Sequence, residues 1–193
     1  MFVDDLNLVL EIVREKGHKI SKVFFKIAME LAKKENSAEL AYELALIVEN
    51  GKNKDIENKR AELCKVVVNS QNPKFAYLYA RDIPKADIQS LQKVVEVSKN
   101  AEYATEFAAD IYGIDITNLQ QVVLESKEPN FAYRFAKYVE NCDVKSLENI
   151  VAKSKDIELI QKFVNDIEGA NVKRLNSIKR DLVKKDREKS FKL

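Results

Sequence analysis

Apolar positions recur along the chain at intervals of 28 residues. When four segments are numbered 1 to 28 from Leu63, Leu91, Leu119 and Leu147, columns 1, 4, 5, 13, 14, 17, 18, 21, 24 and 26 are apolar or aromatic in every segment. Columns 26, 1, 4 and 5 are spaced as on one face of a helix, and so are columns 13, 14, 17, 18 and 21. Each segment is therefore predicted to form two short amphipathic helices.

Capping residues mark the predicted ends of these helices. Column 25 carries residues whose side chains can accept bonds from the first turn of the first helix, namely Asp87, Asp115, Asp143 and Asn171. Column 11, the expected first position of the second helix, holds Pro73 and Pro129. Column 23, just past that helix, holds Gly113, Asn141 and Gly169, which tolerate positive φ. Column 8 is Ser70, Ser98, Ser126 and Ser154, and we expect each hydroxyl to bond a preceding carbonyl near the helix end.

Helices of about three turns do not persist alone in water, so each pair needs neighbours to cover its apolar face. A fixed period of this length is typical of stacked supersecondary units. The sequence thus predicts an all-α fold, an α-solenoid of short helical hairpins. Units begin near residues 28, 63, 91, 119 and 147, and a terminal half-unit covers 175–182. The helical-repeat stack is assigned to 35–182, with 1–34 as N-terminal capping helices.

The 28-residue pattern changes toward both ends of the chain. Upstream, Ala41-Tyr42 matches Ala76-Tyr77 at a spacing of 35, and the seven extra residues are expected to be split between helix and loop. Asp55 is the expected cap and Ile56 the expected first apolar residue of a lengthened helix. Before that, one helix should end at Gly17 and Ser21 should cap the next. Downstream, Lys179 replaces the valine of column 5, which suits the polar outer face of a last helix. Residues 183–193 are expected to form a basic, disordered tail.

Alternating short helices with an aspartate at the first cap resemble the helical-hairpin repeat families, HEAT-like repeats in particular. The units here are shorter than HEAT and armadillo units, and the Trp-Leu-Gly-Tyr pattern of tetratricopeptide repeats is absent. The resemblance is one of architecture. It implies a module that holds a protein partner, or in some families a nucleic acid.

Composition narrows the class of protein. The 33 basic and 31 acidic residues nearly cancel, so the whole chain is not a polycation built for nucleic acid. No run of 18 apolar residues predicts a membrane span, and two aspartates in the first five residues argue against a secretory signal. Two cysteines are too few for a disulfide framework. We therefore expect a cytoplasmic protein without membrane contact.

The sequence carries little that suggests chemistry. His18 has no metal-ligand neighbour at suitable spacing, and Cys64, expected to be exposed at column 2, lacks a visible base. The aspartates of column 20, Asp82, Asp110 and Asp166, are open to two interpretations, a ladder of acidic groups or a solvated edge, of which the edge is favoured. No phosphate loop, nucleophile elbow or paired-cysteine metal motif occurs. No enzyme activity, cofactor, metal or small-molecule substrate is expected.

A protein partner is expected to bind the variable columns of the second helix, 15, 16 and 19. Tyrosine, arginine and lysine anchors fall there, and the candidates are Tyr77, Arg81, Tyr133, Arg134 and Lys137. The alternative is that the tyrosines complete the packing between helices. Packing is favoured for Tyr77, and both interpretations stay open for Tyr133. Adaptor, scaffold and inhibitor roles all fit such a module.

Nucleic-acid binding through the C-terminal end is the second hypothesis. Residues 63–170 hold 13 basic and 16 acidic side chains, whereas residues 171–193 hold nine basic and three acidic. Candidate phosphate contacts are Lys179, Arg180, Lys184, Lys185 and Arg187. A solubilising end without a nucleic-acid role is the favoured interpretation, because Phe191 alone offers a ring for base stacking.

Overall fold

The computed structural model describes residues 5–50 and 56–190, with side chains described for 5–48 and 56–185. Over these residues the protein is all-α, with twelve α-helices, one short 3₁₀ helix and no strand. The chain divides into two compact units, Met1–Ser98 and Lys99–Leu193, a division that the sequence pattern does not predict. The predicted all-α class is confirmed. Each unit is described by itself below.

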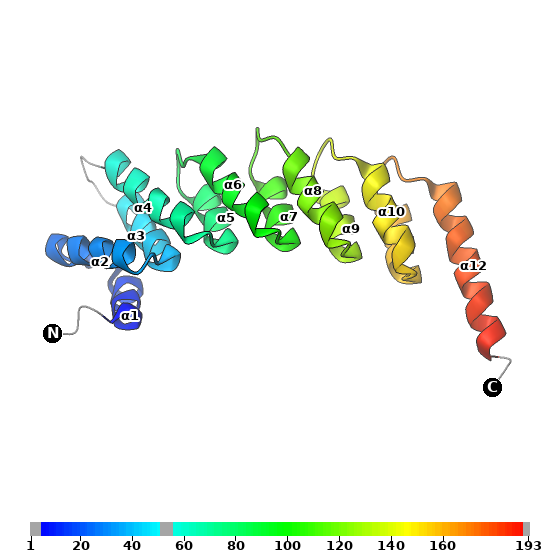
Figure 1. The fold of residues 1–193 in the computed structure, drawn as a ribbon, viewed down its shortest axis with the longest axis horizontal. Helices are drawn as coiled ribbons and strands as arrows, with labels where there is room; N and C mark the ends of the chain where they lie inside the picture. Colours follow the sequence, from blue (N-terminus) through cyan, green and yellow to red (C-terminus); the bar gives the residue numbers. More distant parts are fainter. Residues whose placement is uncertain (1–4, 51–55, 191–193) are drawn as a thin grey trace. The chain divides into compact units, whose positions relative to one another are not determined.

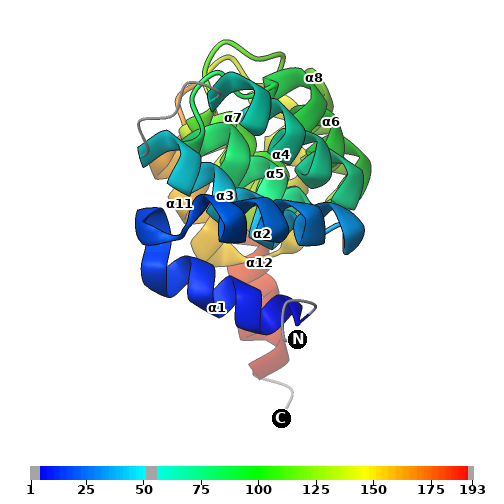
Figure 2. The same ribbon diagram turned by 90° about the vertical axis from the view of Figure 1, so that its left-hand side faces the viewer.

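The first unit contains helices α1 to α6 (Figure 1). Their bounds are α1 Leu6–Lys16, α2 Lys22–Lys34, α3 Ala38–Asn50, α4 Ile56–Ser70, α5 Pro73–Asp82 and α6 Ile88–Ser98, with the 3₁₀ helix η2 at Gly17–Lys19. Helix α1 packs on α3, and α2 packs on α3 and α4 (Figure 2). Helix α3 lies beside α5 and α4 beside α6, so the unit has two helical layers.

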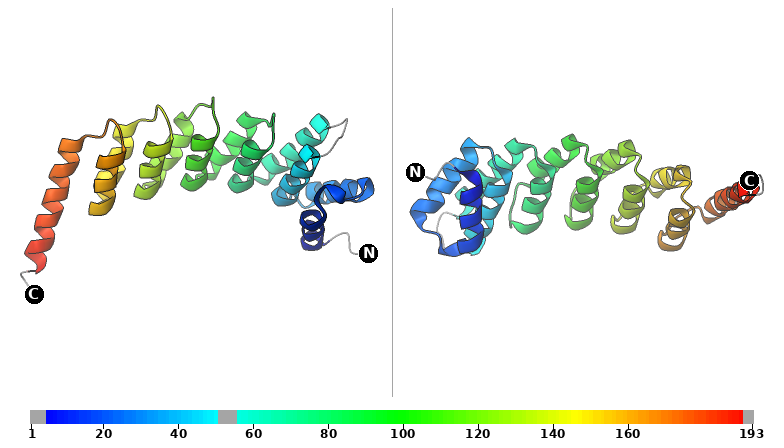
Figure 3. Two further views of the ribbon diagram at one scale, coloured as in Figure 1. Left: turned by 180° about the vertical axis from the view of Figure 1, so that it is seen from behind. Right: turned by 90° about the horizontal axis from the view of Figure 1, so that it is seen from below.

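The second unit repeats this two-layer arrangement with helices α7 to α12. Their bounds are α7 Ala101–Asp110, α8 Thr117–Ser126, α9 Pro129–Tyr138, α10 Val144–Ser154, α11 Ile157–Asp166 and α12 Val172–Ser190. Helices α7, α9 and α11 lie side by side in one layer, α8 and α10 lie in the other, and α12 packs on α11 (Figure 3). The α7–α9–α11 layer carries the candidate site described below.

The predicted helix ends are confirmed. Each column-25 side chain accepts a bond from a first-turn amide: Asp87 from Ser90 (3.2 Å), Asp115 from Thr117 (2.9 Å), Asp143 from Ser146 (3.2 Å) and Asn171 from Arg174 (3.0 Å). Pro73 and Pro129 open α5 and α9. The four column-8 serines each donate to the carbonyl three residues before, at 2.6–2.7 Å. At the N-terminal end, Gly17 follows α1 and the Ser21 hydroxyl caps α2, as expected.

Left-handed backbone occurs at the predicted column and at one that sequence reasoning missed. Gly113, Asn141 and Gly169 have φ of 74°, 57° and 82°, as column 23 requires. Column 9, directly after the serines, is also left-handed, at Gln71, Lys99, Lys127 and Lys155 with φ of 55–62°. Non-glycine residues in this region are uncommon, which is why composition did not reveal the turn. The serine bond to a carbonyl and the left-handed residue together end the first helix of each segment.

The core follows the apolar columns. The column-17 rings of Tyr79, Phe107, Phe135 and Phe163 are fully buried, as are the column-14 alanines Ala76, Ala104 and Ala132. The column-1 leucines Leu63, Leu91, Leu119 and Leu147 are also fully buried. Small side chains beside large rings let neighbouring helices approach closely. The apolar columns of the sequence are thus the buried positions of the structure.

Two expectations about the ends of the pattern are wrong. The seven extra residues lie in helices and not partly in a loop, because α3 spans 13 residues where α5 spans 10, and α4 spans 15 where α6 spans 11. The predicted cap at Asp55 lies outside the described residues. The chain after Val183 is helical through Ser190 and not disordered, because lysine, arginine and glutamate are good helix formers. Residues 191–193 of the predicted tail lie outside the described residues.

Within the described part of the chain, no helix has the length and hydropathy needed to cross a membrane.

Candidate functional site

The outward face of α7, α9 and α11 presents the variable columns of the second unit. Tyr133 on α9 donates its hydroxyl proton to the carboxylate of Asp166 on α11. Lys137 Nζ lies 2.7 Å from the same carboxylate oxygen and 3.1 Å from the Tyr133 hydroxyl. The three side chains therefore form one polar cluster, and both cation and phenol lie on α9 one turn apart.

Electrostatics within this cluster are mutually stabilising. The bond from Lys137, followed by that from Tyr133, lowers the pKa of the Asp166 carboxyl. The bond between Lys137 and Asp166 raises the pKa of Lys137. The separate bond between Tyr133 and Asp166, together with partial burial, raises the pKa of Tyr133. At neutral pH the cluster holds one carboxylate, one ammonium and a neutral phenol. None of these groups is shifted toward the neutral range that acid–base catalysis needs.

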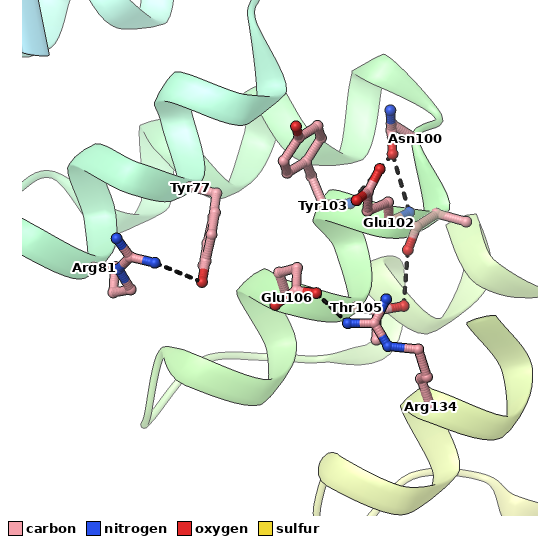
Figure 4. A network of polar contacts seen from close by, with 9 residues as sticks. Tyr77, Arg81, Asn100, Glu102, Tyr103, Thr105, Glu106 and Arg134 are labelled. Atoms are coloured by element: carbon pink, nitrogen blue, oxygen red, sulfur yellow. Dashed lines mark hydrogen bonds and ion pairs between the residues drawn. The ribbon is translucent and has the colours of Figure 1, made fainter. Parts of the chain in front are cut away.

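A second polar pair lies one residue along α9. The Arg134 guanidinium donates to the carboxylate of Glu106 on α7 (Figure 4). The guanidinium also lies 5.9 Å from the centre of the Phe131 ring. The side chains of Arg134 and Glu106 are 38% and 29% exposed. The pair thus joins α7 to α9 and still presents charge to solvent.

A hollow of about 390 Å³ lies beside this pair. It is lined by Thr105, Glu106, Ala109, Asp110, Arg134 and Tyr138. Its origin is the choice of residues at two columns. Column 15 has Thr105 where the next segment has Tyr133, and column 19 has Ala109 where the next segment has Lys137. The Thr105 hydroxyl bonds inward to the Ala101 carbonyl at 2.8 Å, and Tyr138 stands 57% exposed.

The first unit carries a related cluster. Tyr42 on α3 donates to Asp82 on α5 at 2.6 Å, and Arg81 contacts the same carboxylate at 2.8 Å through both Nε and Nη2. Arg81 Nη1 also donates to the Tyr77 hydroxyl at 3.1 Å, and its guanidinium lies 5.2 Å from that ring (Figure 4). These contacts hold the pKa of Asp82 below its usual range, chiefly through Arg81.

The structure therefore divides the five predicted partner-binding residues. Tyr133, Arg134 and Lys137 lie together on α9 of the second unit, and Arg134 lines the hollow. Arg81 is exposed on α5 of the first unit, and Tyr77 beside it is 6% exposed, so Tyr77 offers little contact area. The interpretation that Tyr77 completes packing is the one its burial favours.

Asp110 and Asp166 of column 20 are exposed, as the favoured interpretation of a solvated edge requires. Asp82 and Asp166 also do what that interpretation does not predict, because each accepts a hydrogen bond from a tyrosine hydroxyl of the preceding segment and one from a cation. Sequence reasoning also passed over Thr105, Ala109 and Tyr138. For Thr105 and Ala109, the signal in the sequence is the loss of side-chain volume at columns 15 and 19 relative to Tyr133 and Lys137.

Column 2 departs from the expected exposure, because three of its four residues are buried and only Gln92 is partly exposed. Cys64, expected to be exposed, is 6% exposed, and Gln120 and Glu148 are 7% and 3% exposed. Gln120 accepts from the Asp143 amide at 2.9 Å and donates to the Asp143 carbonyl at 3.2 Å. Glu148 accepts from the Asn171 amide at 2.6 Å, and the Cys64 sulfur accepts from the Asp87 amide. Each side chain therefore binds the backbone where the next segment's first helix is capped.

The residues proposed for nucleic acid fall on α12, where they are not equivalent. Lys179 donates to the Gln161 amide on α11, so it is engaged in packing. Arg180, Lys184 and Lys185 are exposed, and Arg180 Nε donates to the Asn176 carbonyl of its own helix at 3.2 Å. Arg187 lies within α12, but its side chain is outside the described residues. The structure thus leaves three of the five candidates described and available on the surface.

Groups suited to metal or nucleophilic chemistry are scarce in the parts of the chain that the structure describes. No cluster of three or more histidine, cysteine or acidic residues that could hold a metal ion occurs there. His18 lies exposed in η2. Cys64 and Cys142 are both unbridged, and burial raises the pKa of each thiol, which opposes formation of the reactive thiolate. The arrangement of the second-unit face suits contact and charge recognition.

Comparison with known proteins gives no assignment: no family model matches the chain, and no match is found among curated proteins or solved structures.

Proposed function

We propose that this chain is a non-catalytic protein-binding module whose second unit recognises a partner through the outward face of α7 and α9. The observation that carries the proposal is the hollow lined by Thr105, Ala109 and Tyr138, set beside the Glu106–Arg134 pair. In this proposal the 28-residue segments form an α-solenoid, and the protein acts in the cytoplasm as an adaptor, scaffold or inhibitor. Variation at columns 15, 16 and 19, against constant core columns, is what a recognition face requires.

The polar groups on this face are held in place before any partner arrives. Arg134 is fixed by Glu106, and Lys137 by Asp166 and Tyr133. Ordering a long basic side chain on binding costs about 0.5–1.5 kcal/mol, and a preformed contact removes part of that cost. Arginine and tyrosine are also the residue types that most often dominate interface energies. Preorganisation and residue type therefore both favour this face.

The hollow supplies the other element of an interface, a recess for an anchor side chain. Interface hot spots are desolvated side chains seated in such recesses and ringed by weaker polar contacts. Here the recess has an exposed tyrosine wall, and Glu106, Asp110 and Arg134 line it with charge. A partner side chain entering it would meet an aromatic surface and both signs of charge.

Filling the hollow tests the proposal directly. Ala109→Trp places a ring in the recess, and Ala61→Trp makes the same change on α4 of the first unit, where Ala61 is exposed. Immobilised wild-type and variant proteins are used for affinity capture with quantitative mass spectrometry. A partner captured by the wild type and by Ala61→Trp, but at least tenfold less by Ala109→Trp, supports the proposal. Equal capture by all three proteins would contradict it.

A charge swap separates recognition from stability. The double variant Glu106→Arg, Arg134→Glu keeps an ion pair between α7 and α9 but reverses its direction. Thermal stability should stay close to wild type because an exposed pair contributes only about 0.2–1 kcal/mol. Capture of the same partner should fall, because the charge pattern that it meets is inverted. Unchanged capture by the swapped protein would exclude this pair from the interface.

Nucleic-acid binding is the second candidate, and the helical state of α12 favours it. Lys173, Arg180 and Lys184 are seven and four positions apart, so they share one helix face, and all three are exposed. A salt titration of gel shifts tests this candidate. Binding through these cations should weaken steeply with salt and be lost in the triple variant Lys173→Glu, Arg180→Glu, Lys184→Glu. Absence of nucleic-acid binding at low salt would contradict this second candidate function.

A further inference from the structure

We propose that the first unit contains a binding site for a small organic anion with an apolar body, located between α4 and the start of α6. A pocket of about 570 Å³ lies there. Its volume is within the range of about 300–1,000 Å³ that is usual for small-molecule sites. This site is independent of the protein-binding face proposed above, since every residue that lines it belongs to the first unit.

One continuous face of α4 forms the long wall of the pocket. Its lining residues recur every three or four positions over the length of the helix, namely Glu57, Arg60, Ala61, Cys64, Lys65, Val68 and Asn69. Helix α4 is four residues longer than α6, and in the alignment of segments the extra turn lies at its N-terminal end. That turn brings Glu57 within 3.0 Å of Lys85 in the α5–α6 connection. The extra turn of α4, which interrupts the 28-residue spacing of the sequence, therefore lengthens this wall of the pocket.

The floor of the pocket is apolar, and its polar atoms already have partners. Tyr79 is fully buried, and its hydroxyl donates to the Arg60 carbonyl at 2.8 Å. Cys64 is 6% exposed, its sulfur accepts from the Asp87 amide, and burial raises the pKa of its thiol. Ala61, Val68 and Ala86 complete this surface. Such a floor binds a hydrocarbon or aromatic group by excluding water, because no polar atom there needs a new partner.

The charged groups at the rim leave a positive balance. Arg60, Lys65 and Lys85 line the pocket together with two carboxylates, those of Glu57 and Asp87. The Glu57 carboxylate pairs with Lys85, and the Asp87 carboxylate accepts from the Ser90 amide and hydroxyl. Lys65 follows Cys64 in the sequence, and its side chain is exposed. A carboxylate or sulfonate on the ligand would therefore be directed toward Lys65, with its apolar part on the floor.

Two naphthalene dyes of similar shape provide the test on the full-length protein. Anilinonaphthalene sulfonate carries an anionic group, and phenylnaphthylamine is its neutral counterpart. We expect saturable, one-to-one binding of the sulfonate with fluorescence enhancement, and weaker binding of the neutral dye. Lys65→Glu should weaken sulfonate binding roughly three- to tenfold and leave the neutral dye unchanged. Lys153→Glu, an exposed lysine on α10 of the second unit, is the matched control and should change neither.

The location of the dye is tested by filling the pocket with a tryptophan side chain and by mapping the bound dye with NMR. Ala61→Trp should abolish binding of both dyes, whereas Ala109→Trp in the second unit should leave it intact. Circular dichroism melts of each variant exclude a loosened fold as the source of dye fluorescence. Amide NMR shifts on adding the sulfonate should concentrate in 57–69 and 79–90.

Three results would overturn the inference. No saturable binding, or binding that survives Ala61→Trp, would remove the site. Shifts centred in the second unit would place the dye elsewhere. If Lys65→Glu weakens binding of both dyes equally, or weakens binding of neither, the site does not prefer an anionic ligand.

Discussion

The Tyr133 hydroxyl donates to the Asp166 carboxylate, which lies 33 positions later in the chain. Tyr42 and Asp82 form the same contact 40 positions apart, at 2.6 Å. The separations differ by the seven residues inserted between the first two segments. In both cases a tyrosine of column 15 binds an aspartate of column 20 in the following segment. Tyr133, one of the two tyrosines expected to serve a partner, thus also links consecutive helix pairs, as Tyr42 does in the first unit.

The contribution of each tyrosine–aspartate hydrogen bond to stability can be measured by removing the tyrosine hydroxyl. Tyr133→Phe should lower the free energy of unfolding by about 0.5–1.5 kcal/mol, and Tyr42→Phe by about 1.5–3 kcal/mol, because its bond to a carboxylate is more shielded from water. Guanidinium denaturation followed by circular dichroism provides the measurement. Tyr112→Phe is the control, because that side chain is 91% exposed. A loss from Tyr133→Phe no larger than that from Tyr112→Phe would show that the link contributes nothing.

Acid should weaken the same links. Bonds from Lys137 and Tyr133 lower the pKa of Asp166, and bonds from Arg81 and Tyr42 lower that of Asp82. A carboxylate whose folded pKa lies below its unfolded value near 4 stabilises the fold fully above about pH 5. This stabilisation is lost as the pH falls through the folded pKa.

The test compares denaturation midpoints at about pH 6 and about pH 3. Asp166→Asn should show a smaller fall in midpoint on acidification than wild type, since one source of proton uptake is gone. Asp181→Asn, on an exposed position of α12, should behave as wild type. An unchanged acid response in Asp166→Asn would contradict the assignment of Asp166.

Gln120 is expected to be a strong contributor to stability although it is polar. It is 7% exposed and bonds both the amide and the carbonyl of Asp143. Gln120→Ala leaves these two backbone groups without their partner and should cost about 1–3 kcal/mol. The neighbouring Gln121→Ala removes only an exposed contact to Glu125 and should change stability by less than about 0.5 kcal/mol. Similar losses from both substitutions would refute the role of Gln120.

Glu148 should hold α12 in place. It is 3% exposed, accepts from the Asn171 amide, and pairs with Arg174 of α12 at 2.6 Å. Arg174→Ala leaves the buried carboxylate without its cation, so local opening of α12 should become more frequent. Amide hydrogen exchange should show at least tenfold faster exchange in 172–182, with little change in α9.

Two companion variants of Arg174→Ala check the physical cause. Arg180→Ala removes an exposed cation that donates to the backbone of its own helix, and it should leave exchange unchanged. Glu148→Gln combined with Arg174→Ala should recover part of the protection, because the uncompensated charge is gone. If Arg180→Ala and Arg174→Ala accelerate exchange equally, the Glu148 contact is not what holds α12.

Local sequence determined where the helices begin and end. The column-25 caps, Pro73 and Pro129, the column-8 serines and Gly113 and Gly169 all act within four residues of their own position. Hydrogen bonds and φ preferences of that range are readable from sequence because they do not depend on how helices are packed. The apolar columns likewise predicted the buried rings, since helical spacing alone places them on one face.

Tertiary structure decided what the polar columns do. Gln120 reaches Asp143 over 23 positions and Tyr133 reaches Asp166 over 33, and only packed helices bring such residues together. Whether Cys64 or Glu148 is buried depends on where the next helix pair packs. Hydrophobic periodicity and capping residues in the sequence do not determine that position. The hollow beside Ala109 and the pocket beside Ala61 are likewise spaces between helices. Their size follows from side-chain volumes on several elements at once, and no single stretch of sequence encodes it.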